Sequence, residues 1–152
     1  MISPTWRQWL TPEEKKDILD GWEDRQTTLM RPATASGGRG FVDAEIVPLC
    51  NALNQLPGVC TLQSCAGHAA NDSDGAEYSG ELWLRLDYAM SCRFEKAVHQ
   101  LASNPLIERV GKIYWGDGKE TITIKFQGNE AGWNKLRESG AAILAFFSKI
   151  HY

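Results

Sequence analysis

The first apolar pattern along the chain has the spacing of a helix. Ile18, Leu19 and Trp22 recur at positions that share one face of a helix. Thr11 precedes them in position to cap the helix, and Glu14 follows where a capping box places its carboxylate. The pattern predicts a helix that packs one apolar stripe on the rest of the protein. We therefore interpret residues 1–30 as an N-terminal helical arm.

Three later segments also have helical periodicity. One follows Asp43 as its expected cap and contains Pro48, which is either tolerated near the helix start or marks the true first turn. The next is expected to begin with Ser91 as its cap and to stop at Asn104-Pro105. The last is expected to begin at Asn129 and to run toward the end of the chain.

Four segments have the composition and alternation of strands: 59–62, 81–87, 106–115 and 120–126. The second alternates most cleanly, because its leucines face one way while Trp83 and Arg85 face the other. The last two are expected to form a hairpin joined through the glycine-bearing segment 116–119.

The predicted order is helix, helix, strand, strand, helix, hairpin, helix. This order indicates an α+β fold with a four-stranded, mostly antiparallel sheet that carries its helices mainly on one face. The 152 residues, of which 43% are hydrophobic, suit a single domain over residues 1–152 with a core of its own.

Charge and hydropathy narrow the class of partner. The net charge is −3, with acidic and basic residues interspersed, so the composition argues against binding to long nucleic acid and favours a small ligand or a local basic pocket. No apolar run of roughly 18 residues and no leader pattern is present, which predicts a cytoplasmic protein without a membrane span. The four cysteines are then expected to be reduced thiols.

The stretch from Thr61 to His68 is the strongest candidate for a ligand site. It follows a turn signal and a short strand, and it is expected to break into a loop after residue 62. The small residues Ser64, Ala66 and Gly67 would let a ligand approach the backbone closely, while Cys65 and His68 add a thiol and an imidazole. A tight turn without a partner is the alternative.

A second loop, over residues 31–40, combines two arginines with a run of small residues. Ser36, Gly38 and Arg39 could wrap a phosphate with backbone amides and a guanidinium group. A plain connector that happens to contain arginines is the alternative. Trp83, on the face of its strand away from the leucines, could stack on a base or pack under a helix.

Two chemical uses of the cysteines stay open. Cys65 and His68 could form a nucleophilic pair, although no acid is placed to orient the imidazole. Cys60, Cys65 and His68 could bind zinc, although structural zinc sites usually have closely paired ligands. Cys50 and Cys92 lie on apolar helix stripes and are expected to be core residues.

Two of these motifs together resemble the tRNA wybutosine-synthesising methyltransferase family. The similarity runs over residues 36–101, through the segment 36–43, then Asn54, then Ser64-Cys65-Ala66-Gly67, then Trp83-Leu84. The family has a Ser-x-Lys-Gly-x-Val-Asp segment that opens a helix and a Ser-Cys-Ser-Gly-Arg loop after the next strand. Short bacteriophage and bacterial proteins also carry a Ser-Cys-x-Gly-His form.

The resemblance implies the family's fold and, as an activity, methyl transfer from S-adenosylmethionine to a tRNA base. This chain has His68 in place of the family's arginine and Arg39 in place of its lysine, and it is shorter after residue 101. Because it also lacks a basic surplus, we expect a small nucleotide-binding module without a cofactor or a metal, and without catalysis. A methyltransferase acting on RNA and a protein-interaction module that uses the aromatic arm are the alternatives, and homo-oligomerisation stays open.

Overall fold

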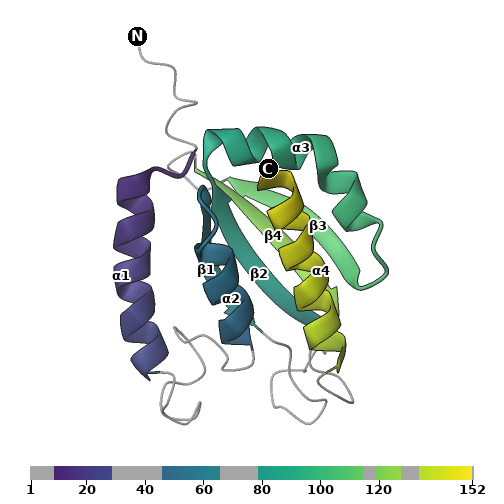
Figure 1. Cartoon of the computed structure of the whole chain (residues 1–152), viewed down its shortest axis with the longest axis horizontal. Coiled ribbons are helices and arrows are strands. Elements are labelled where there is room, and N and C mark those ends of the chain that lie inside the picture. Colours follow the sequence, from purple (N-terminus) through teal and green to yellow (C-terminus); the bar gives the residue numbers. More distant parts are fainter. Residues whose placement is uncertain (1–8, 29–45, 66–78, 115–118, 128–133, 152) are drawn as a thin grey trace.

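The structure is a computed structural model that describes residues 9–28, 46–65, 79–114, 119–127 and 134–151. Figure 1 shows the elements, which in chain order are α1 (Pro12–Thr28), α2 (Val47–Asn54), β1 (Val59–Cys65), β2 (Ser79–Leu86), α3 (Tyr88–Ala102), β3 (Ile107–Tyr114), β4 (Glu120–Gln127) and α4 (Asn134–His151). The predicted order of elements is confirmed.

The four strands form one sheet in the order β1-β2-β4-β3, and each neighbouring pair is antiparallel. Helices α2, α3 and α4 lie over one face of this sheet, whereas α1 stands beside β1 at its edge (Figure 1). The α+β class, the antiparallel sheet and the placement of helices mainly on one face are therefore as predicted.

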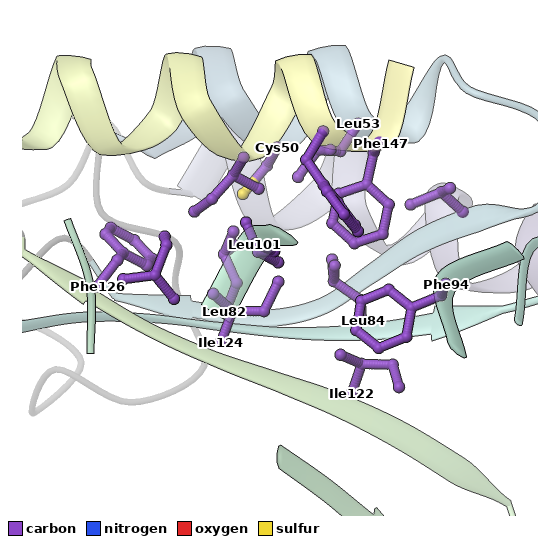
Figure 2. Close-up of a cluster of buried hydrophobic side chains, with 14 of the residues drawn as sticks. Cys50, Leu53, Leu82, Leu84, Phe94, Leu101, Ile122, Ile124, Phe126 and Phe147 are labelled. Atoms are coloured by element: carbon purple, nitrogen blue, oxygen red, sulfur yellow. The ribbon is translucent and has the colours of Figure 1, made fainter. Parts of the chain in front are cut away.

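The core lies between the sheet and the three helices that cover it. Leu82 and Leu84 of β2 and Ile122 and Ile124 of β4 point toward the helices, where Phe147 meets them (Figure 2). All of these side chains are fully buried or nearly so. Burying a side chain of this size stabilises the fold by about 1.5–3 kcal/mol, so the clean alternation of β2 and β4 is what holds helices and sheet together.

Two predicted helix caps are wrong. The cap residue of α2 is Ile46, which makes no side-chain cap hydrogen bond, and a proline occupies its first turn, so the predicted cap Asp43 precedes the helix and lies outside the described residues. The cap of α3 is Asp87, whose carboxylate accepts from the Met90 N–H at 2.8 Å. Ser91 is instead buried inside the helix. The cap of α3 directly follows the last residue of β2, and sequence preference alone did not fix that point.

Strand β1 is longer than predicted. It continues through Ser64 and Cys65, which were expected in a loop, because β2 supplies hydrogen-bonding partners as far as the pairing of Cys65 with Glu81. Cys92 also differs from the prediction: it is exposed, because α3 turns Met90 and Phe94 toward the core and leaves the intervening residue outside. Cys50 is buried, as predicted.

Candidate functional site

Six of the nine predicted ligand-binding residues lie outside the described residues: Ser36, Gly38, Arg39, Ala66, Gly67 and His68. Of the other three, Ser64 and Cys65 are the last two residues of β1, and Trp83 is in the middle of β2. The structure therefore shows where the two predicted loops join the described elements. The positions of these junctions tell whether both loops start from the same part of the fold.

Helix α2 and strand β1 form an antiparallel unit. Only residues 55–58 separate them, and the Asn54 side chain joins them directly: its Oδ1 accepts from the Thr61 N–H at 2.8 Å and its Nδ2 donates to the Thr61 Oγ1 at 2.9 Å. Because the two elements run in opposite directions, the start of α2 and the end of β1 lie at the same end of the unit.

Helix α4 contacts both the end of β4 and the first turns of α2. The Ser139 hydroxyl donates to the Gln127 carbonyl at 2.6 Å, and Gln127 is the register partner of Ser79. The neighbouring residue Gly140 faces Leu49 in the first turns of α2. The end of β1, the start of β2, the end of β4 and the start of α2 thus meet at one end of the sheet, which we call the loop end.

A β-bulge shifts the register of β1 just before the loop end. Thr61 is opposite Leu84, but Gln63 and not Leu62 is opposite Trp83, so the pairing moves by one residue. Cys65 consequently occupies the position opposite Glu81 that Ser64 would hold in a regular strand. Bulges of this kind are common beside functional sites, because they re-aim the residues that follow.

Trp83 lies on the face of the sheet opposite the core, as its alternation with Leu82 and Leu84 predicted. It is half-buried, and its indole N–H donates to the Glu81 Oε1 at 2.7 Å, which fixes the orientation of the ring along β2. Its register partner on β4 is Thr123, which in turn faces Gly111 of β3. A ring beside small and hydroxyl-bearing residues is a surface on which a planar group can stack.

Arg85 was also expected on this outer face, but it is buried. Its side chain is only 9% exposed, and its Nη1 lies 3.1 Å from the Glu14 Oε2 of α1. Lys119, just before β4, forms a second ion pair with the same Glu14 oxygen. We call Glu14, Arg85 and Lys119 the arm cluster, because it joins the N-terminal helical arm to the sheet.

The arm cluster was not predicted from the sequence. Thr11 caps α1 as expected, since its Oγ1 accepts from the Glu14 N–H at 3.1 Å. The Glu14 carboxylate, however, binds Arg85 and Lys119, and the Leu10 N–H donates to the Leu86 carbonyl at 2.9 Å beside it. The signal in the sequence was the isolated arginine of β2, whose charge needs a partner wherever the outer face is covered.

Two atoms of the arm cluster have unused hydrogen-bonding capacity. Within the described parts of the chain, the buried Arg85 Nε donor and the buried Glu14 Oε1 acceptor have no hydrogen-bond partner. Buried polar atoms in native proteins are nearly always paired, so each orphan needs an explanation. A bound polar group is one of the standard explanations.

Lys15, next to Glu14 on α1, faces a different set of groups. Its Nζ donates to the Leu56 carbonyl at 2.8 Å, and burial lowers the pKa of its amine below the usual 10.5, against the opposing attraction of Cys60 and Asp87. Gly58 lies close by, between α2 and β1. Its φ is +77°, and a Cβ there would lie 2.4 Å from the Asp87 carboxylate. The Asp87 N–H donates to the Gly58 carbonyl at 2.9 Å.

A second polar cluster lies on the helix-covered face, at the hairpin of β3 and β4. The buried Glu120 accepts from the Ser91 hydroxyl at 3.5 Å and from the Tyr114 hydroxyl at 3.2 Å, and its Oε1 lies 3.4 Å from the Lys112 Nζ. The negative charge of Glu120 raises the pKa of the exposed Tyr114. We call Ser91, Lys112, Tyr114 and Glu120 the hairpin cluster.

Two further features of the described residues concern the metal-binding and membrane-spanning alternatives. In the residues that the structure describes, no three side chains of His, Cys, Asp or Glu are gathered as metal ligands would be. The helices in these same ranges include none with the length and apolar character that crossing a membrane requires.

Comparison with known proteins adds little to this geometry. No family model matches the chain, and no curated protein matches it. The structure titled "Structure of PH1069 protein from Pyrococcus horikoshii" is similar to this chain with a TM-score of 0.40 and 14% sequence identity, over 88% of this chain and 92% of that one. A likeness at this level is too weak to transfer a function, so only the chain's own residues can support one.

Proposed function

We propose that the protein is a small nucleotide-binding module whose site lies at the loop end of the sheet. The residues proposed to hold the ligand are Ser36, Gly38, Arg39, Ser64, Cys65, Ala66, Gly67, His68 and Trp83. Arg39, His68 and the backbone amides of the small residues would bind the phosphate groups, because such donors hold anions without performing chemistry. Trp83 would stack on the base.

The observation that carries this proposal is the antiparallel unit of α2 and β1. The segment with Arg39 enters α2 at Ile46, and the segment with His68 leaves β1 at Cys65, so both are attached at the loop end. The Asn54 side chain fixes the unit by its two hydrogen bonds to Thr61. A ligand held between the two segments would therefore rest on a rigid helix–strand pair, as binding loops on a scaffold commonly do.

We propose sequestration as the biological use of this binding. The short bacteriophage form of the Ser-Cys-x-Gly-His motif suggests a phage protein that holds a host nucleotide signal without cleaving it, in the host cytoplasm. Such anti-defense activity needs only tight binding, and it fits the net charge of −3, which disfavours tRNA as a partner. The wybutosine-family resemblance remains part of this proposal for the fold of residues 36–101.

A thermal-shift screen with cyclic dinucleotides, ADP-ribose derivatives and S-adenosylmethionine tests the proposed function. We expect a nucleotide to raise the melting temperature and to be recovered chemically unchanged from the protein. A shift with S-adenosylmethionine alone would favour the RNA methyltransferase instead. No shift across the panel would contradict nucleotide binding and point to a protein partner.

Single substitutions locate the binding to the two loops. Arg39→Ala and His68→Ala should each weaken nucleotide binding by about tenfold, which corresponds to the loss of a charge-assisted hydrogen bond. The melting temperature of the free protein should change little. Arg137→Ala, on the exposed surface of α4, is a matched control for removing a cation. Unfolding of either loop variant would assign that residue a structural role.

A further inference from the structure

The outer face of the sheet, opposite the core, is covered in one part and accessible in another. Arg85 of the arm cluster and Thr121, near the start of β4, are buried. Toward the loop end, Trp83 and Lys125 are half-buried and Arg109 is exposed. The accessible part of this face is therefore its loop-end part, where the two segments of the proposed site are attached.

Strand register places two cations next to each other on this accessible part. Lys125 alternates along β4 with the core residues Ile124 and Phe126, so its side chain belongs to the outer face. Its register partner on β3 is Arg109, and directly opposite residues of antiparallel strands have Cα atoms about 4.5–5.5 Å apart. The two cations therefore stand side by side on one face.

Like charges directly opposite each other on neighbouring strands are destabilising. Two acids flank the pair: Glu81, the register partner of Lys125 on β2, and Glu108, next to Arg109 in the chain. Glu81 already accepts the Trp83 indole N–H at 2.7 Å, and Glu108 is exposed to solvent. An anion bound over the two cations would offset their repulsion. Phosphate suits both, because a guanidinium group binds it through two parallel hydrogen bonds and an ammonium group binds it as a point charge.

The aromatic ring on this face is within reach of the same ligand. Lys125 is two residues along β4 from Thr123, which is the register partner of Trp83. With about 3.4 Å per residue along a strand and about 4.8 Å between strands, the backbones of Trp83 and Lys125 are about 8 Å apart. This separation is within the length of a single nucleotide, so one ligand can reach both the ring and the cations.

We propose that Arg109 and Lys125 form a phosphate subsite for the nucleotide whose base stacks on Trp83. The guanidinium group of Arg109 donates to the phosphate oxygens, and the ammonium group of Lys125 pairs with the same phosphate. This inference rests on the proposed nucleotide binding and adds two residues of the sheet to that site. Both cations lie toward the loop end, where the segments with Arg39 and His68 join the fold.

Isothermal titration of single variants tests the subsite, with ADP-ribose and cyclic diadenylate as the probes. We expect Arg109→Ala and Lys125→Ala each to weaken binding of the probe that wild type binds by about tenfold, the loss of one charge-assisted contact. Lys96→Ala is the matched control, because it removes an exposed cation from α3, on the other face of the sheet. It should leave the affinity unchanged.

A substitution of the flanking acid should act in the opposite direction. Glu81→Gln removes a negative charge beside Lys125 but keeps an oxygen that can accept the Trp83 indole N–H. We expect it to strengthen binding of the same probe by about twofold to threefold. Circular dichroism and the melting temperature of each free variant show whether it folds, and the exposed Arg109 allows the test even where Lys125→Ala does not fold.

The outcomes separate this inference from the proposed function. Binding by wild type, together with Arg109→Ala and Lys125→Ala variants that bind as well as Lys96→Ala, would overturn the phosphate subsite and leave nucleotide binding intact. No binding of any nucleotide by wild type would overturn both. Unfolding of Arg109→Ala would assign Arg109 a structural role and overturn its place in the subsite.

Discussion

Glu14 of the arm cluster is partly buried and Glu120 of the hairpin cluster is buried. They lie on opposite faces of the sheet and differ in how completely they are bound. Both oxygens of Glu120 have partners, Ser91 and Lys112 on one and Tyr114 on the other. Glu14 uses one oxygen for two cations and leaves the other without a partner among the described residues.

The difference indicates two different roles. A fully satisfied polar network fixes a structure, because every buried group has regained the hydrogen bonds that it lost with water. A partly satisfied network keeps the free-energy cost of its unpaired buried groups. The hairpin cluster therefore has the properties of a structural connection between α3 and the β3–β4 hairpin, whereas the arm cluster joins α1 to the sheet and stays partly unsatisfied.

Replacing Glu14 or Glu120 by alanine should give the largest losses of stability, and the two losses should differ. Glu14→Ala leaves the guanidinium of Arg85 buried without its carboxylate, and we expect it to lower the free energy of unfolding by about 3 kcal/mol. Glu120→Ala should cost about half as much, roughly 1.5 kcal/mol, because Lys112 keeps its ion pair with Glu95. Urea denaturation of both variants measures this, and equal losses would contradict the comparison.

A change at Gly58, between α2 and β1, should disturb both the local backbone and the cap of α3. Gly58→Ala places a side chain on a residue with φ of +77°, against the Asp87 carboxylate that caps α3. We expect a loss of about 2 kcal/mol from the strained backbone and the disturbed cap, read by urea denaturation. Gly111→Ala is the control, because its Cβ would lie 3.1 Å from a single hydroxyl oxygen of Thr123. An equal loss in the control would argue against a special role for Gly58.

The smallest effect should come from Lys15, beside the arm cluster. Burial lowers the pKa of its amine in the folded protein, so between that lowered pKa and 10.5 the unfolded chain binds the proton more strongly. The contribution of Lys15 to stability therefore rises with pH through this window. Wild type should gain stability relative to Lys15→Met between neutral pH and pH 10.5, in urea titrations at each pH. A constant or falling difference would contradict this.

The sequence was a good guide where a residue's environment depends on its neighbours along the chain. The alternation of β2 predicted that Leu82, Leu84 and Leu86 face the core, and all three are buried. The same local reasoning was wrong for the cap of α3, because Asp87 and Ser91 are both good caps by residue type. Their position relative to the end of β2 decided between them.

In the candidate site, too, some features followed from the local sequence and others only from the tertiary structure. The glycine-bearing loops and Trp83 could be proposed from residue types, but the bulge that shifts Cys65 opposite Glu81 could not, because it arises from pairing between two strands. Arg85 was predicted on the outer face, and its burial was not, since its partner Glu14 lies far away in the sequence.

What the sequence by itself determined is the set of elements, their order, the α+β class and the faces of the central strands, because periodic apolar patterns report burial along one element at a time. What only the tertiary structure decided is which distant groups meet. The ion pairs of Glu14 with Arg85 and Lys119, and the attachment of α2 and β1 at the loop end, depend on strand order and on the packing of α1 and α4. No local pattern encodes these, because the contacts join residues from separate parts of the chain.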